Sequence, residues 1–189
     1  MKKSIALIVE GYEEESYLAR LISFNIFAKD NEIKIINAKG VGNIFSRYQN
    51  AYQSNRYDEI YAFCDGDNCS STILELRKRI NEDLYGEDDN ESTNHIIFAN
   101  PVTLQIVLMH FKYIILKNVG KKSNASIIEE LTGIKNYKAN DDQIDEMMNL
   151  IKYSSYEVMK ANLEKLSSDI SVIPSTNFLY LLSVLEKID

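Results

Sequence analysis

The chain has few of the residues that build zinc sites. Its 189 residues include only two cysteines and two histidines. Cys64 and Cys69 are not accompanied by the second Cys or His pair that a zinc site requires. The sequence therefore argues against a zinc site. We expect Cys64 to lie in a strand and Cys69 to be a thiol in a loop, and we expect the protein to be in a reducing compartment.

Long apolar runs and an excess of positive charge are missing as well. The first apolar run, residues 5–9, is too short for a secretory signal, and no stretch is long enough to span a bilayer. We therefore expect a cytoplasmic protein with no membrane association. A formal net charge of -7 and a pI near 5.0 argue against a broadly basic nucleic-acid-binding surface. Any contact with nucleic acid has to be local or mediated by a metal ion.

Strand and helix patterns alternate over residues 1–120, which predicts an α/β fold. The order favours a mostly parallel sheet of about four strands with helices on both faces. Beyond Gly120 the pattern is only helical, so we expect an α/β domain over residues 1–120 and a helical portion over residues 121–189, packed as one compact unit. The predicted strands are 5–9, 32–38, 60–64 and 95–99, and the predicted helices are 13–24, 44–52, 72–84, 102–117, 126–132, 141–153, 154–167 and 176–188.

The third predicted strand ends in two aspartates separated by one glycine, Asp65-Gly66-Asp67. Residues two apart on an extended chain point to the same side, so the two carboxylates are expected to lie together. Carboxylates this close repel each other unless a cation lies between them or one takes a proton. Their hard oxygen atoms suit Mg²⁺ or Mn²⁺. The alternative is that residues 65–68 form only a polar turn, because Asp, Gly and Asn are typical turn residues.

The first predicted strand also ends in an acid, Glu10, which precedes Gly11. In an open parallel sheet, ligands bind beyond the carboxyl ends of the strands. If the first and third strands are neighbours, Glu10, Asp65 and Asp67 converge on one space of the size of a metal ion. This convergence favours the metal site over the polar turn.

These motifs resemble the Toprim domain of topoisomerases, primases and small nuclease-like proteins, in which one strand ends in Glu-Gly and a later strand ends in D-x-D. Here the motifs are IALIVEG, with Glu10, and FCDGD, with Asp65 and Asp67. More narrowly, the segments VEGYEEESYL, NPVTLQIVLMHF and PSTNFLYLLSVL resemble the small stand-alone Toprim proteins of the RloB and overcoming-lysogenization-defect (OLD) type, which occur among bacterial restriction and phage-defence genes.

The resemblance implies an activity and roles for individual residues. Glu10 would act as general acid or base beside the metal, and Asp65 and Asp67 would hold Mg²⁺ or Mn²⁺. The implied activity is metal-dependent, nuclease-like phosphodiester chemistry on DNA or RNA in phage defence or restriction, and the resemblance admits a protein partner such as an ATPase. In one departure, the NP-initiated helix has Leu104 and Gln105 where RloB-like proteins carry a glutamate. That helix is therefore expected to supply no carboxylate.

Five further residues are weaker candidates for contact with phosphate or nucleic acid. Gly11 follows Glu10 directly, and Lys39, Gly42 and Asn43 lie in a loop before a predicted helix. Such a loop can present backbone N–H groups and a positive charge to a phosphate, although a plain strand-to-helix turn is the alternative. His110 is either a phosphate contact or a hydrogen-bonded packing residue.

Two other functions are compatible with the sequence. A catalytically degenerate Toprim-like module would bind nucleic acid, a nucleotide or a protein partner without turnover, because Leu104 leaves the site short of carboxylates. A haloacid-dehalogenase-like phosphatase would use the first aspartate of D-x-D as a nucleophile. In that class the motif normally lies on the first strand and continues to Thr or Val. Here it lies on the third strand and continues to Asn68-Cys69, which disfavours the phosphatase.

Overall fold

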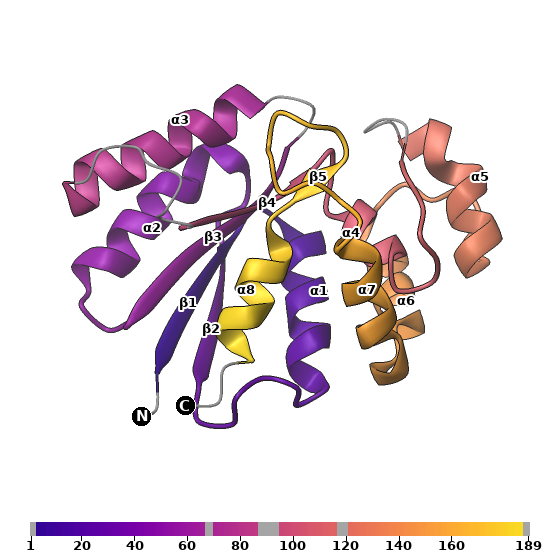
Figure 1. Cartoon of the computed structure of the whole chain (residues 1–189), viewed down its shortest axis with the longest axis horizontal. Helices are drawn as coiled ribbons and strands as arrows, with labels where there is room; N and C mark the ends of the chain where they lie inside the picture. Colours follow the sequence, from indigo (N-terminus) through magenta and orange to yellow (C-terminus); the bar gives the residue numbers. More distant parts are fainter. Residues whose placement is uncertain (1–2, 67–69, 87–94, 117–120, 187–189) are drawn as a thin grey trace.

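The computed structural model describes residues 3–66, 70–86, 95–116 and 121–186, which form a five-stranded sheet with helices on both faces (Figure 1). The strand order is β2-β1-β3-β4-β5. The first four strands are parallel, and β5 is antiparallel to β4. The predicted α/β class and mostly parallel sheet are thereby confirmed. The strands are β1 (Ser4–Val9), β2 (Glu32–Asn37), β3 (Glu59–Asp65), β4 (Ile96–Asn100) and β5 (Ser175–Thr176).

The central strands β1 and β3 are apolar on both sides because helices cover both faces of the sheet. Every side chain of residues 5–9 is at most 1% exposed. Alternate residues join opposite cores: Ala6 and Ile8 contribute to one, and Leu7 and Val9 to the other. The edge strand β2 instead has exposed residues at Glu32 and Lys34, and its other residues are half-buried.

The helices divide between the two faces (Figure 1). No helix in the described ranges is long and apolar enough to cross a bilayer. One face is covered by α2 (Ile44–Gln53) and α3 (Ser70–Ile80), which continues into the π-helical turn η2 (Asn81–Tyr85). The other face carries α1 (Tyr12–Ser23), α4 (Leu104–Leu108), α5 (Lys121–Thr132), α6 (Asp141–Leu150), α7 (Tyr156–Leu163) and α8 (Phe178–Leu185).

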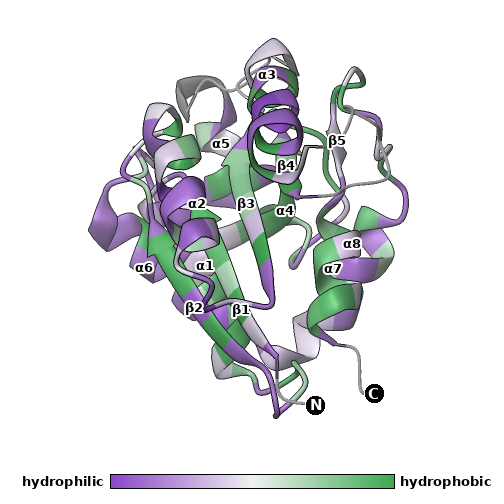
Figure 2. Ribbon diagram, turned by 90° about the vertical axis from the view of Figure 1, so that its left-hand side faces the viewer, coloured by the Kyte–Doolittle hydropathy of each residue, from purple (hydrophilic) through white to green (hydrophobic). Residues whose placement is uncertain are grey.

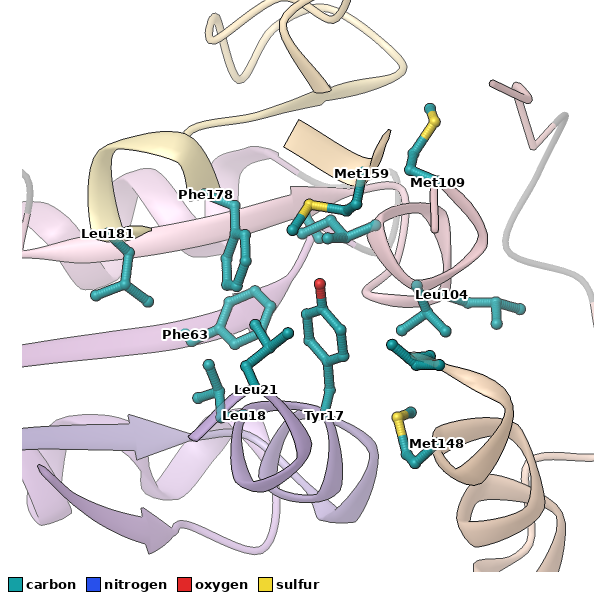
Figure 3. Close-up of a cluster of buried hydrophobic side chains, with 14 of the residues drawn as sticks. Tyr17, Leu18, Leu21, Phe63, Leu104, Met109, Met148, Met159, Phe178 and Leu181 are labelled. Atoms are coloured by element: carbon teal, nitrogen blue, oxygen red, sulfur yellow. The ribbon is translucent and has the colours of Figure 1, made fainter. Parts of the chain in front are cut away.

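The C-terminal third packs into the same core as the sheet. The ring centroid of Phe178 lies 5.2 Å from that of Phe63 in β3 and 5.7 Å from that of Tyr17 in α1 (Figure 3). Beside β5, the amide of Asn177 bonds the backbone of β4: its Oδ1 accepts from Phe98 N at 2.9 Å, and its Nδ2 donates to the carbonyl of Ile96 at 2.8 Å. Residues after 120 therefore complete the sheet and its core.

The helix predicted over residues 102–117 is wrong beyond its first turns. Helix α4 spans only Leu104–Leu108, and the chain then turns and runs without regular structure to Leu116. The buried amide of Gln105 holds this returning segment, because its Nε2 donates to Ile114 O at 2.6 Å and its Oε1 accepts from Leu116 N at 2.8 Å. A long-range side-chain contact thus overrides the local helical pattern.

Two further differences concern short elements. The two residues of β5 were not expected to form a strand, because a run this short carries no alternation that the sequence could reveal. The pattern Ser154-x-x-Glu157 predicts a capping box at the start of the helix expected over residues 154–167, and this prediction is wrong. A 3₁₀ turn, η3 (Tyr153–Ser155), precedes α7, and the hydroxyl of Ser155 donates to Lys152 O at 2.7 Å instead of capping the helix.

Replacing Asn177 with alanine should destabilise the fold, because it leaves Phe98 N–H and Ile96 C=O without their side-chain partners. We expect the free energy of unfolding, measured by urea denaturation, to fall by about 1–3 kcal/mol. Ser183→Ala is the control, because it removes only an exposed bond to Tyr180 O on the same helix, and should change stability by less than about 0.5 kcal/mol. Equal losses in the two variants would contradict the role of Asn177.

Candidate active site

The candidate site lies at the carboxyl edge of the sheet, between β1 and β3. The connection after β1 runs through α1 on one face, and the connection after β2 runs through α2 on the other. The strand order therefore reverses between β1 and β3, and the two connections leave this point in opposite directions, which is where open α/β sheets bind their ligands. Glu10 and Asp65 lie at this point. The expectation that the first and third strands are neighbours is confirmed.

Glu10 reaches from the end of β1 to the end of β3. Its backbone N–H donates to Phe63 O at 3.1 Å, and its Oε2 accepts the backbone N–H of Asp65 at 3.2 Å. The structure thus brings the carboxylate of Glu10 to the backbone of Asp65, at the end of the neighbouring strand. Asp67, the third predicted carboxylate, lies outside the described residues.

The carboxylate of Asp65 has a fixed orientation. Its Oδ1 accepts two hydrogen bonds from Thr103, one from the backbone N–H at 2.6 Å and one from the hydroxyl at 2.7 Å. Its Oδ2 accepts no hydrogen bond from the described part of the chain, so one oxygen is positioned by the protein while the other is available to a ligand. Thr103 was not a predicted site residue, although it belongs to the segment after Asn100-Pro101 that the resemblance singled out.

Two more glutamates, from the first turn of α1, belong to the site. Glu14 is 4% exposed, and its Oε2 accepts the N–H of Gly11, the residue that caps α1, at 2.9 Å. Burial, together with the charges of Glu14 and Glu13, raises the pKa of Asp65 well above its ordinary value. The sequence shows three glutamates at this turn, but acidic residues are common at helix N-termini and so did not identify the two that face Asp65.

A tyrosine from the C-terminal third also reaches this cluster. The hydroxyl of Tyr137, in the connection between α5 and α6, donates to Glu13 Oε1 at 3.4 Å. Tyr137 is 3% exposed, and its pKa is raised by burial and by Glu13. The helical portion therefore contacts the acidic cluster through Tyr137, a contact that no local sequence pattern predicts.

The donor atoms at this edge fit a hard divalent cation. Within the described residues, no three His, Cys, Asp or Glu side chains form a group that could hold a metal ion. Mg²⁺, however, commonly binds proteins through one or two carboxylates and takes waters and substrate phosphates as its other ligands. Asp65, through the Oδ2 atom that no described residue bonds, and Glu10 are the carboxylates that would hold such an ion.

Gly66 is required at its position by space. A Cβ there would lie 2.8–2.9 Å from the Oδ1, Cγ and Cβ atoms of Asn100. Asn100 cannot move aside, because its Nδ2 donates to Ile170 O and Val172 O at 3.0 and 3.2 Å. The glycine between the two aspartates therefore lets β3 end in close contact with β4.

The NP segment supplies no carboxylate, as expected. Leu104 is 5% exposed and belongs to the core beneath the site. The amide of Gln105 is occupied by backbone groups of residues 114–116. Neither side chain contributes to the acidic cluster, and Thr103 is the residue of this segment that does contact Asp65.

The loop after β2 contacts the site through its backbone. The N–H of Gly40 donates to Glu10 O at 2.8 Å, so this loop lies beside the candidate catalytic residue. Its other weak candidates, Lys39, Gly42 and Asn43, are exposed. The backbone N–H of Lys39 donates to Asn37 Oδ1 and that of Asn43 donates to Gly40 O, which is the geometry of a strand-to-helix turn.

His110 is buried away from the edge, at 3% exposure. Its Nε2 lies 3.0 Å from the hydroxyl of Tyr17, and its Nδ1 lies 2.9 Å from the hydroxyl of Ser155. Ser155 donates to Lys152 O, so it accepts the proton on Nδ1, and Tyr17 donates to Nε2. With both nitrogens engaged, the geometry supports the packing interpretation and leaves no nitrogen for a phosphate.

Burial lowers the pKa of His110 from its ordinary value of 6.5 to about 4. Between these two values the unfolded chain binds more protons than the folded one, so stability is full above pH 6.5 and is lost as the pH falls towards 4. We expect a loss of about 3 kcal/mol over this interval, at ~1.4 kcal/mol per pH unit. Urea denaturation of wild type and His110→Asn at several pH values tests this. An unchanged pH slope in the variant would contradict it.

The raised pKa of Asp65 has the opposite effect on stability. Ionisation of Asp65 opposes folding, so the folded protein loses stability as the pH rises through the folded-state pKa. Asp65→Asn keeps an oxygen for both Thr103 bonds and removes the charge. At pH 7 we expect the melting temperature of Asp65→Asn to exceed that of wild type by about 2–4 °C for each kcal/mol by which loss of the buried charge stabilises the fold. This difference in melting temperature should shrink at acidic pH.

Added Mg²⁺ should make wild type the more stable of the two proteins, because it should raise the melting temperature of wild type and not that of Asp65→Asn. Asp83→Asn, at an exposed aspartate, is the control and should change neither result. An Asp65→Asn protein that is less stable than wild type at pH 7, or that gains equally from Mg²⁺, would count against the site.

Comparison with known proteins gives no match: no family model, no curated protein and no solved structure is significantly similar to the chain. The resemblance to Toprim domains therefore rests on the residues quoted above and on their arrangement.

Proposed function

We propose that this chain is a metal-dependent phosphodiester enzyme of the Toprim type that acts on DNA or RNA. The observation that carries the proposal is the contact between Glu10 and Asp65, the ends of two adjacent parallel strands, at the point where the strand order reverses. Glu13 and Glu14 add negative charge there and raise the pKa of Asp65. An acidic cluster of this kind favours a cation and lowers the cost of proton exchange near neutral pH.

The proposed roles follow from the positions of the side chains. Asp65, oriented by Thr103, would hold Mg²⁺ or Mn²⁺ through its Oδ2, with Glu10 beside it. The metal would neutralise charge on the scissile phosphate. Glu10 would take the proton of the attacking water or return a proton to the leaving oxygen. By the same resemblance, we propose a role in phage defence or restriction, with a protein partner such as an ATPase.

A non-catalytic, Toprim-like binding module is the second candidate. It is favoured by one observation: Leu104 lies in the core and Gln105 is occupied by backbone groups, so the NP segment supplies no acid to the edge. A site with fewer carboxylates can bind a cation and a nucleic acid without turning the substrate over.

Cleavage assays with labelled single- and double-stranded DNA and RNA, in Mg²⁺, Mn²⁺ or EDTA, test the proposal. We expect metal-dependent cleavage that falls about 10²- to 10⁴-fold in Glu10→Gln, because a positioned proton-transfer group contributes that much. Glu15→Gln, in the first turn of α1, is the control. It keeps an oxygen for its bond from Asn37 Nδ2 and should retain activity.

Calorimetric titration of Mg²⁺ into wild type and Asp65→Asn separates the two candidates. Metal binding that is lost in the variant, without cleavage by the wild type, would establish the binding module. No metal binding by the wild type would overturn both versions of the proposal.

A further inference from the structure

Residues 33–57 form a locally basic segment of this acidic chain. Residues 33–57 contain four basic residues and neither Asp nor Glu, although the whole chain has 28 acidic and 21 basic residues. The four are Lys34, Lys39, Arg47 and Arg56, which we call the basic flank. A protein with a negative net charge can contact nucleic acid through a local basic patch of this kind.

The basic flank follows β2, α2 and the segments after each of them; Figure 2 shows the ribbons of β2 and α2. Lys34 lies in β2, Lys39 in the loop after it, Arg47 on α2 and Arg56 in the turn before β3. All four are exposed. Their charged groups make no hydrogen bond or ion pair with any described residue, in contrast to Lys3 and Lys160, which pair with glutamates.

The two arginines border a hollow of about 220 Å³ between α2 and β2. Its other walls include the polar side chains of Asn50 and Ser54 and the apolar side chain of Ile36. Guanidinium groups recognise phosphate through paired N–H donors, and amide and hydroxyl groups add further donors. The hollow therefore offers the chemistry of a phosphate site with no acidic side chain in its lining.

The flank is continuous with the candidate active site. The loop after β2 lies against Glu10, because Gly40 N donates to Glu10 O. From that loop, Asn43, Arg47, Asn50 and Ser54 recur at helical spacing and so lie along one side of α2. A helix of 10 residues is about 15 Å long, which spans about four phosphates of one strand of a duplex.

Protection of the sheet edge explains only part of this charge. Lysines on edge strands discourage pairing with other chains, and Lys34 in β2 has that position. Arg47 and Arg56 lie outside the sheet, so edge protection gives no reason for them. The arginines thus carry the argument for a ligand.

We propose that the basic flank binds the sugar-phosphate backbone of a nucleic acid and leads it along α2 to Glu10 and Asp65. The identity of the ligand as the substrate rests on the proposed function. The contact itself is sequence-independent, because it is made to phosphates.

Fluorescence anisotropy with labelled oligonucleotides of about 20 units, in EDTA at ~50–200 mM salt, tests this without cleavage. The variant is Arg47→Gln/Arg56→Gln, and the charge-matched control is Lys29→Gln/Lys152→Gln at exposed lysines elsewhere. For duplex DNA we expect the slope of log K against log salt to weaken by about 1.8 in the variant alone, as for two lost phosphate contacts. Affinity at the lowest salt should fall about tenfold or more.

The inference is overturned if wild type binds none of the oligonucleotides, or if variant and control lose the same affinity. It is also overturned if polyglutamate competes as well as DNA, because the flank would then fit an acidic protein. Failure of the proposed function is distinguishable from these results. Nucleic-acid binding that depends on the arginines, without metal-dependent cleavage, would contradict only the proposed enzyme activity. Metal-dependent cleavage with an unchanged KM in the variant would contradict only the role of the basic flank.

Discussion

The pairing of β1 with β3 is the constraint on which the other features of this protein depend. It places strands from two different crossover units side by side, so α1 and α2 must cover opposite faces. The two connections diverge at the carboxyl edge as a geometric consequence of that reversal. The same pairing brings Glu10 to the backbone of Asp65, and the loop after β2 lies beside Glu10.

The site is built at a cost to stability. A buried carboxylate beside two others would be more stable protonated or replaced, and the fold retains Asp65 by fixing one oxygen with two hydrogen bonds from Thr103. Such arrangements are common at functional sites, because a group strained in the free protein gains most when its ligand binds. The burial and rigid support of Asp65 distinguish it from an aspartate in an ordinary polar turn.

The features predicted correctly from the sequence are those with a regular local pattern. The four parallel strands follow from short apolar runs, and the meeting of Glu10 with Asp65 follows from the rule that parallel strands end at one edge. The sequence could not reveal contacts between distant residues. Gln105 ends α4 early by bonding residues 114–116, and Thr103 and Tyr137 reach the site from elsewhere in the chain.

The D-G-D motif was interpreted correctly as a strand end, but for an incomplete reason. From the sequence alone, a glycine at this place indicates conformational freedom at the transition from strand to loop. The structure shows that Gly66 is needed because Asn100 of β4 occupies the space of a side chain. A requirement for space depends on the neighbouring strand, which no local pattern can indicate.

The contribution of Asn177 and Phe178 has a consequence for synthesis on the ribosome. Until these residues leave the exit tunnel, the outer edge of β4 has no Asn177 amide and no β5 beside it, and Phe63 lacks its aromatic neighbour. Until then the nascent chain exposes a strand edge and an apolar sheet face. We expect productive folding to wait for the emergence of α8, whose docking acts as the closing step.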